Sequence, residues 1–453
     1  MPQPTRKQRK RRTTRRSRSR RAVVVGQTFL SAGRQECLPH PVELVYIISR
    51  PAIGILRADK GFDMIHKQQF SVHFSYDVVF TRSLFALGNE TLANALPRTG
   101  TPARMAVFID SGVHKAWPQL PETILAWAQA HKDVVFLPER PMIVPGGEES
   151  KNDLTFVQRI THQLQRMQIC RHSYVVAVGG GAMLDAVGLA AAVFHRGVRL
   201  IRVPTTVLSQ NDSGIGVKNS VNLDGVKNLI GTFAPPYAVI NDALFLETLD
   251  DRDWHGGIAE AIKVAVIKDA AFLDAIDAHA EALAARNLEA MEVLVKRCAE
   301  LHLDHIATAG DAFEMGSARP LDFGHWAAHK LESMTNFELR HGEAVGIGIA
   351  LDVYCAAELG FITRTERDRI RTIMTRCGMK LWHPILEKRS GSVVPMVLNG
   401  LEEFRQHLGG KLTLTMPDGI GRKREIHNLK PELVADAVAW LAEGKRAPAA
   451  KSN

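Results

Sequence analysis

A strand that runs into three successive glycines constrains the fold of this chain more than any other segment. Residues 175–192 read VVAVGGGAMLDAVGLAAA, where an apolar run meets Gly179–Gly181 and continues into a segment with helical character. Glycines at such a turn let the backbone approach a pyrophosphate, and the free N–H groups at a helix start favour its negative charge. The turn lacks the GxGxxG spacing of the common dinucleotide fingerprint, so an ordinary tight turn remains an alternative at this point.

The segments around this turn predict two domains of different class. Strand-type runs occupy residues 104–113 and 133–139, and residues 152–167 have the periodicity of an amphipathic helix. A βαβ series of this kind is typical of a nucleotide-binding half. Beyond about residue 250 strand signals nearly vanish, and helical periodicity prevails, as in residues 256–276 and 343–359. We predict an α/β N-terminal nucleotide-binding domain plus an all-α C-terminal domain, with a cleft between them.

The N-terminal segment is expected to lie outside these domains. Residues 1–21 carry eleven lysines and arginines and no acidic residue, so the rest of the chain has a net charge of −2 although the whole has +9. Such an arm can bind nucleic acid or an acidic membrane surface, but it is more often solvated, and we expect no specific nucleic-acid partner. Strand-like alternation over residues 70–81 follows Met64 closely. The predicted divisions are a basic extension at 1–63 that is disordered or not native to the folded protein, domains at 64–250 and 251–445, and a tail at 446–453.

Composition favours a cytoplasmic protein without a membrane span. No apolar run approaches the roughly 20 residues that a membrane helix needs, and the run after the basic arm is too interrupted for a signal peptide. The five cysteines are scattered and form no CxxC pair. We therefore expect reduced, mostly buried thiols and neither a disulfide nor a thiolate metal site.

Three residues in the helical half are candidates for a metal site. Glu260 and Lys263 lie three apart on one face of an apolar segment. A surface ion pair is one reading, but the helix is expected to be buried, where a carboxylate without a partner is costly. A metal would remove that cost. His325 and His341 supply two imidazoles, which with one carboxylate leave an open coordination position, as in catalytic zinc sites. Each histidine alone is more often structural, but their combination with Glu260 favours a metal site.

A polar stretch between the halves suits a phosphorylated, polyhydroxylated ligand. Residues 202–231 contain cations and amides at high density, and these groups recognise phosphate and hydroxyl oxygens. They include Asp212, Lys218, Asn222, Lys227 and Asn228.

Together these motifs resemble the sugar phosphate cyclases typified by 3-dehydroquinate synthase. The resemblance covers roughly residues 70–425, and its motifs occur in order: GGGAMLD, RGVRLIRVPTT, ND followed by K, VKN, AEAIK, FGH and HGE. It implies a dehydroquinate synthase-like fold, an NAD cofactor, a Zn²⁺ ion with Co²⁺ as an alternative, and a homodimer. It also implies a carbon–oxygen lyase. Oxidation by NAD acidifies a C–H group so that phosphate leaves, the hydride returns, and an aldol step closes a carbocycle.

The resemblance also assigns residues to roles. The implied zinc ligands are Glu260, His325 and His341. The implied NAD contacts are Asp110, Glu148, Lys151, Gly180, Gly181, Asp185, Thr205, Thr206 and Thr248. The implied catalytic residues are Asp212, Lys263, His329 and Lys218. The implied substrate and phosphate contacts are Asn228, Lys227, Asp322, Lys411 and Arg196. Of these, Arg196 would come from a neighbouring subunit.

Departures from the pattern point to the substrate. Asp322 stands where dehydroquinate synthases carry Asn, Ala318 stands where they carry Arg, and their substrate-facing Lys is absent near Asp304. These changes disfavour a carboxylated substrate, although Arg319 is a candidate replacement for the missing arginine. RPLDFGH resembles the branch that cyclises sedoheptulose 7-phosphate to valiolone-type products, and LDFGHWAAHKLE resembles the EboD-like branch.

We therefore predict cyclisation of a seven-carbon sugar phosphate. The predicted alternatives are 3-dehydroquinate synthase proper and a metal-dependent polyol dehydrogenase of the same fold, which would not need the cation-rich stretch. A non-catalytic scaffold is a weaker alternative, because Asp212, Lys218, Glu260, His325 and His341 are all present.

Overall fold

The computed structural model describes residues 66–224, 226–308, 312–313, 320–389, 395–407 and 410–446. The extension predicted for residues 1–63 lies outside this part of the chain, as does the predicted tail apart from Arg446. Ala318 and Arg319, on which part of the substrate prediction rests, also lie outside it. None of the helices in these residues is long and apolar enough to cross a membrane.

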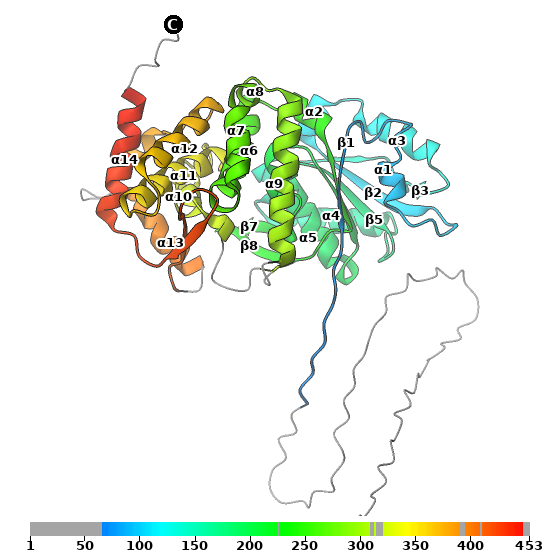
Figure 1. Ribbon diagram of the computed structural model, residues 1–453. Helices are drawn as coiled ribbons and strands as arrows, with labels where there is room; N and C mark the ends of the chain where they lie inside the picture. Colours follow the sequence, from blue (N-terminus) through cyan, green and yellow to red (C-terminus); the bar gives the residue numbers. More distant parts are fainter. Residues whose placement is uncertain are drawn as a thin grey trace, which may run out of the picture. The chain divides into compact units, whose positions relative to one another are not determined.

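The first half is built on a parallel sheet, several strands of which are labelled in Figure 1. Its strand order is β1–β9–β6–β5–β2–β3, and β4 also pairs with β2. All neighbouring strands in this sheet run parallel. The chain moves outward from β2 to β4 and then continues with β5 on the other side of β2, so the direction of winding reverses there. The strands are β1 (Asp77–Thr81), β2 (Ala103–Asp110), β3 (Val135–Phe136), β4 (Met142–Val144), β5 (Tyr174–Gly179), β6 (Arg199–Pro204) and β9 (Ala238–Asp242).

Both faces of this sheet are covered, which explains why β5 consists only of buried residues. Successive residues of β2 alternate between two apolar clusters. Val107 and Ile109 belong to a cluster with Trp127 of α3 (Leu120–Ala130). Ala106 and Phe108 belong to the other cluster, which includes α4 (Leu154–Arg166) and α5 (Gly181–Val193). The shorter helices of this half are α1 (Thr91–Asn94) and α2 (Ser111–Ala116).

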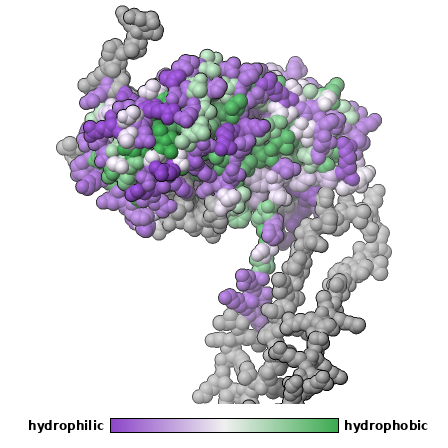
Figure 2. Space-filling view, viewed as in Figure 1, coloured by the Kyte–Doolittle hydropathy of each residue, from purple (hydrophilic) through white to green (hydrophobic). Residues whose placement is uncertain are grey.

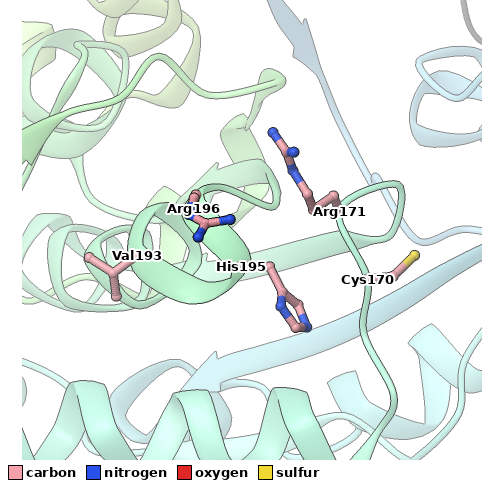
Figure 3. A pocket seen from close by; sticks show the side chains of 5 residues that line it. All are labelled: Cys170, Arg171, Val193, His195 and Arg196. Carbon is pink, nitrogen blue, oxygen red and sulfur yellow. The ribbon is translucent and has the colours of Figure 1, made fainter.

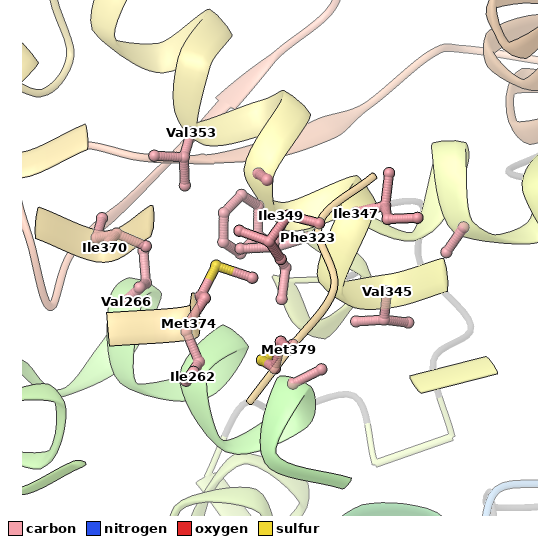
Figure 4. Packing of buried hydrophobic residues seen from close by; sticks show 14 of the residues in the cluster. Ile262, Val266, Phe323, Val345, Ile347, Ile349, Val353, Ile370, Met374 and Met379 are labelled. Atoms are coloured by element: carbon pink, nitrogen blue, oxygen red, sulfur yellow. The ribbon is translucent and has the colours of Figure 1, made fainter. Parts of the chain in front are cut away.

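The second half is mainly helical, as predicted, and has its own core, part of which Figure 4 shows. Ile262 of α6 and Val345, Ile349 and Val353 of α11 contribute to this core and carry almost no exposed surface. Hydrophilic side chains cover much of the face in Figure 2, with smaller hydrophobic areas among them. The helices are α6 (Asp251–Lys268), α7 (Ala270–Ala278), α8 (Ala280–Ala284), α9 (Leu288–Thr308), α10 (His325–Met334), α11 (His341–Glu358), α12 (Arg364–Arg376), α13 (Asn399–His407) and α14 (Pro431–Arg446).

Glycines bring α6, α10 and α11 unusually close together. A Cβ atom at Gly342 would overlap the carbonyl oxygen of Gly256, so α11 and α6 meet backbone to backbone. A Cβ atom at Gly348 would overlap the carbonyl oxygen of Gly324, which has φ +80° and directly precedes α10. These approaches need residues without a side chain. They place the start of α11 beside α6 and the start of α10 beside α11, and each of the three helices carries one predicted metal ligand.

Three local features differ from the sequence prediction. The helical half also contains a hairpin of β10 (Leu414–Pro417) and β11 (Lys423–Ile426). The alternating segment 70–81 is a strand only over its last five residues, because β9 offers partners only from Asp77 onward. The run 133–139 forms only the two-residue strand β3, which pairs with the first two residues of β2 before Pro138, a residue without an N–H donor.

Candidate active site

Most of the residues predicted to contact NAD lie along the carboxyl edge of the parallel sheet. Asp110 ends β2, Gly179 ends β5, and Thr205 directly follows β6. In an open parallel sheet, ligands bind at this edge, at the point where the direction of winding reverses. That point lies between β2 and β5. Thr248 is more peripheral, since it is exposed and accepts a hydrogen bond from Nε1 of Trp117 at 3.1 Å.

The glycine turn after β5 has two kinds of glycine. A Cβ atom at Gly181 would lie 2.6 Å from Oγ of Ser213, and one at Gly179 would lie 2.9 Å from Cβ of Asp110. The protein's own packing therefore requires both residues. Gly180 has more room, because a Cβ atom there would lie 3.4 Å from Cγ2 of Thr206. Gly180 is the N-cap residue of α5, and no side chain among the described residues caps this helix. An uncapped helix N-terminus next to a glycine is suited to an anion.

Charged side chains surround this turn. Asp110 is buried and accepts a hydrogen bond from the backbone N–H of Gly112 at 2.7 Å. Burial raises the pKa of Asp110, although backbone N–H groups oppose the shift. Lys151 and Asp185, both predicted NAD contacts, form an ion pair with Nζ and Oδ2 2.5 Å apart. Glu148 lies beside them at the start of the same short helical turn, Glu148–Lys151.

Glu260, His325 and His341 converge in the helical half. The Nε2 atoms of both histidines lie 3.8 Å from Oε1 of Glu260, and one ligand atom from each residue lies within 4.8 Å of the other two. Glu260 is 0% exposed, and its Oε1 has no hydrogen-bond partner in the described residues. A buried carboxylate oxygen without a donor is costly. A metal ion between these three residues would supply the missing partner, and the carboxylate–imidazole donor set suits zinc.

The outer nitrogens of both imidazoles are oriented. Nδ1 of His325 lies 3.2 Å from the carbonyl oxygen of Phe323, and Nδ1 of His341 lies 3.2 Å from Oε2 of Glu332. Because both partners are acceptors, each Nδ1 acts as the donor, and in the neutral form of each ring the Nε2 lone pair is free for a metal. Burial, together with nearby Lys263, holds the pKa of His325 well below its usual value. Burial also lowers the pKa of His341, but the Glu332 carboxylate outweighs it and raises that pKa.

Lys263 and Asp212 lie beside this cluster. Lys263 is 2% exposed and pairs with Oε2 of Glu260. Burial lowers its pKa, but the carboxylates of Glu260 and Asp212 raise it further, so the ammonium group stays charged. Burial would raise the pKa of Asp212, but Lys263 and His302 hold it below its usual value. Oδ1 of Asp212 lies 2.8 Å from Nδ1 of His302. An ammonium donor and a carboxylate acceptor therefore stand side by side, as contacts to adjacent hydroxyl groups require.

The predicted phosphate-side residues are only partly brought together. The ring of His329 lies 5.5 Å from that of His325, and Asp322 is near enough to Lys263 to raise its pKa. Lys218 and Asn228 lie on the hairpin of β7 (Lys218–Leu223) and β8 (Val226–Phe233).

Three further residues that were predicted to contact the substrate or its phosphate, Arg196, Lys411 and Lys227, have other surroundings. Arg196 is exposed and lines a hollow of about 550 Å³ with Cys170 and His195 (Figure 3). Lys411 is exposed and lies three residues before β10. Lys227 forms ion pairs with two carboxylates, Glu332 and Glu148.

Glu332 and His302 were not predicted from the sequence. Glu332 follows His325 and His329 at helical spacings of seven and three residues, so the same helix face carries all three. That spacing was the available signal. His302 had no such signal, because it lies on α9, 90 residues after the carboxylate it contacts.

Comparisons with known proteins agree with this architecture. Residues 141–256 match the family described as 3-dehydroquinate synthase N-terminal, and residues 257–398 match 3-dehydroquinate synthase C-terminal. A 2-epi-5-epi-valiolone synthase from an Actinomyces species is 32% identical over 381 residues, which cover 82% of this chain and 95% of that protein. Another, from Streptomyces hygroscopicus subsp. jinggangensis, is 31% identical over 383 residues, which cover 83% and 89%.

Solved structures share the fold. The structure of 2-epi-5-epi-valiolone synthase from Streptomyces hygroscopicus subsp. jinggangensis, with NAD⁺ and Zn²⁺ bound, has a TM-score of 0.73 at 29% identity and covers 83% of this chain and 99% of that chain. A 2-deoxy-scyllo-inosose synthase complexed with carbaglucose-6-phosphate, NAD⁺ and Co²⁺ has a TM-score of 0.63 at 21% identity, with coverages of 80% and 96%. The chain belongs to the 3-dehydroquinate synthase-like family of sugar phosphate cyclases.

Proposed function

We propose that this protein cyclises a seven-carbon sugar phosphate of the sedoheptulose 7-phosphate type to a carbocycle, with loss of phosphate. The observation that carries the proposal is the convergence of Glu260, His325 and His341 around a buried carboxylate oxygen that lacks a donor, directly beside Lys263 and Asp212. The relatives named 2-epi-5-epi-valiolone synthase support the same conclusion. The reaction makes the protein a carbon–oxygen lyase.

The cofactors in this proposal are NAD and a divalent metal, zinc or cobalt. NAD would lie at the carboxyl edge of the sheet, near Asp110 and the N-terminus of α5, and the metal would be held by Glu260, His325 and His341. When bound, the metal polarises an alcohol oxygen and NAD accepts and later returns a hydride. The related synthase structure with NAD⁺ and Zn²⁺ supports this pair.

The chain's own groups would orient the substrate. The Lys263 ammonium group can donate a hydrogen bond to a substrate hydroxyl and favours negative charge on its oxygen. The Asp212 carboxylate, held ionised by Lys263 and His302, can accept a hydrogen bond from the neighbouring hydroxyl. Lys218, Asn228 and His329 are proposed to contact the phosphate group. These contacts would hold two hydroxyl groups and the phosphate group of the substrate. They would thereby restrict the conformation of its carbon chain, as ring closure requires.

The far end of the substrate would meet Asp322. A carboxylate there would face a like charge, which should cost several kcal/mol of transition-state binding, on the order of 2–5. A neutral hydroxymethyl group would find an acceptor instead. The proposal therefore excludes the carboxylated substrate of dehydroquinate synthase as the preferred one.

We further propose a cytoplasmic homodimer. The four cysteines of the described residues are free, and three of them are buried, which suits a reducing compartment. Arg196 is exposed, with its backbone at φ +63°, and an exposed arginine is available to a second copy of the chain.

One assay tests the proposal. Purified protein incubated with NAD and sedoheptulose 7-phosphate should release inorganic phosphate without net formation of NADH, because each turnover returns the hydride. The kcat/KM for this sugar should exceed that for the carboxylated substrate of dehydroquinate synthase by at least about 30-fold, which corresponds to the lower end of that cost of about 2–5 kcal/mol. Accumulating NADH would indicate a polyol dehydrogenase, and a preference for the carboxylated substrate would indicate a dehydroquinate synthase.

A further inference from the structure

Glu332 is a buried carboxylate to which the proposed chemistry gives no role. It lies on α10, two turns after His325, and is 2% exposed. Its two oxygens have different partners: Oε2 lies 3.2 Å from Nδ1 of His341, and Oε1 lies 2.5 Å from Nζ of Lys227. The carboxylate therefore bridges a proposed metal ligand of the helical half and a cation of the β7–β8 hairpin.

Lys227 is committed to this bridge. Its ammonium group contacts Glu332 and lies 3.6 Å from Oε1 of Glu148, and it stands 5.2 Å from the ring centre of Phe337. A cation between two carboxylates has little net charge left for a phosphate group. This geometry does not suit the phosphate-binding role that the sequence predicted for Lys227.

We propose that Glu332 is a positioning residue for the metal ligand His341, and that Lys227 holds Glu332 in place from the β7–β8 hairpin. The proposal rests on the metal site of the proposed function. A carboxylate that accepts the Nδ1 proton of a metal-binding histidine fixes its tautomer and ring orientation and makes Nε2 a stronger ligand. Lys227 and Asn228 lie on the same hairpin. The contact of Lys227 with Glu332 therefore connects this hairpin to the metal ligand His341.

A different ion position is the main rival arrangement. His329, Glu332 and His341 also offer ligand atoms within 4.8 Å of one another. In that arrangement Glu332 would itself bind the ion. Both oxygens of Glu332 already have partners, Lys227 on Oε1 and His341 on Oε2. Glu260 also pairs with a lysine, Lys263 on Oε2, but its Oε1 has no hydrogen-bond partner in the described residues and is therefore the better ligand atom.

Zinc affinity tests both parts of the proposal. Metal-free protein is titrated with Zn²⁺ in competition with a chromophoric chelator, and NAD affinity is measured alongside to show that each variant is folded. Glu332→Gln, which keeps the shape and removes the charge, should weaken zinc binding about 10- to 100-fold. Lys227→Gln should weaken it less, and Glu260→Gln should abolish it. Glu403→Gln is the matched control, because Glu403 is a carboxylate of α13 that also pairs with a lysine, Lys330 of α10, but belongs to neither group of possible metal ligands. It should leave zinc affinity unchanged.

Three results would overturn the proposal. Parent-like zinc affinity in Glu332→Gln would remove the positioning role. Zinc binding lost in Glu332→Gln but kept in Glu260→Gln would place the ion in the rival site. A raised KM for the sugar phosphate in Lys227→Gln at parent zinc affinity would make Lys227 a phosphate ligand. Because zinc affinity is measured without substrate, failure of the parent protein to release phosphate would count against the proposed function alone.

Discussion

At the scale of single residues, Asp352 shows how a buried carboxyl group organises the site from a distance. It lies on α11, and its two oxygens accept hydrogen bonds from Nε1 of Trp326 at 2.7 Å and from the backbone N–H of Gly324 at 2.9 Å. These donors flank His325. Burial raises the pKa of Asp352 to about 7, although both donors lower it. Ionisation near neutral pH therefore costs stability in the folded state.

This shift predicts a pH dependence. The folded pKa is raised above the ordinary value of 3.8, so the contribution of Asp352 to stability is complete below about pH 4 and is lost as the pH rises through about 7. Stability of the parent protein should fall relative to Asp352→Asn by up to about 1.4 kcal/mol per pH unit within this window. Urea unfolding of both proteins at pH 5 and pH 7 measures the difference. Parallel pH profiles would contradict the prediction.

A second residue-scale prediction concerns the metal. His325→Ala should lose stoichiometric zinc, because only two of three ligands would remain, while NAD affinity should stay within about threefold of the parent, a difference below 1 kcal/mol. Elemental analysis after gel filtration and calorimetric NAD titration measure the two quantities. His172→Ala, in an exposed loop, is the control. Equal metal content in His325→Ala and parent would refute the ligand assignment.

Site residues were predictable where a local pattern carried them. Glu260 and Lys263 stood out because charges in an apolar helix need partners, and both are buried. The partners of His302 and Lys227 were not predictable in this way. The contact of His302 with Asp212 and that of Lys227 with Glu332 join residues 90 and 105 positions apart. Such pairs depend on how α9 and α10 pack, which periodicity does not encode.

At the scale of elements, the turns at the sheet edge depend on glycines whose role only the structure reveals. The sequence drew attention to Gly179–Gly181. A further glycine, Gly146, follows β4, and a Cβ atom there would overlap Oδ1 of Asp110. This contact could not be predicted, because β4 and β2 become neighbours only through sheet pairing.

Gly146→Ala should therefore displace Asp110 and weaken NAD binding. We expect at least about a tenfold rise in the dissociation constant, equal to 1.4 kcal/mol, because Asp110 also caps α2 at the same edge. Isothermal titration calorimetry with NAD measures it. Gly88→Ala is the control, since nothing lies within 4 Å of an added Cβ atom there. If Gly146→Ala binds NAD as tightly as the parent protein, the position of Asp110 does not contribute to NAD affinity.

Arg202 organises the loop between Asp212 and β7. It is fully buried in β6 and donates to the carbonyl oxygens of Gly214, Gly216 and Lys218 at 2.7–3.1 Å. Arg202→Met should leave these acceptors unpaired and lower the free energy of unfolding by at least about 3 kcal/mol. Denaturant unfolding tests this, with the exposed Arg171→Met as the control. A loss no larger than that of the control would mean that water replaces the guanidinium group.

At the scale of the whole molecule, the two predicted halves meet at the site. Asn211, next to Asp212, donates a hydrogen bond to the carbonyl oxygen of Gly257 on α6 at 2.9 Å. A Cβ atom at Gly257 would overlap Val207, so α6 packs directly on the loop after β6. The sequence predicted both halves and a cleft between them. The packing of α6 on this loop places Asp212 beside Lys263. The sequence did not predict it, because it depends on contacts between distant segments.

The same scale carries the prediction for the N-terminal extension. In the part of the chain that the structure describes, the apolar clusters of the first half begin with Leu84 and Phe85, and β1 starts at Asp77. The excess positive charge lies in residues 1–21, and the remaining chain carries −2.

Deleting residues 1–63 should therefore leave the Tm and the rate of phosphate release nearly unchanged. It should also abolish retention on a cation exchanger at neutral pH, because the basic arm supplies the electrostatic attraction. Differential scanning fluorimetry, the phosphate assay and chromatography of both proteins measure the three quantities. A fall in Tm of more than about 4 °C, which corresponds to roughly 1 kcal/mol or more in a domain of this size, would show that the extension packs against the fold.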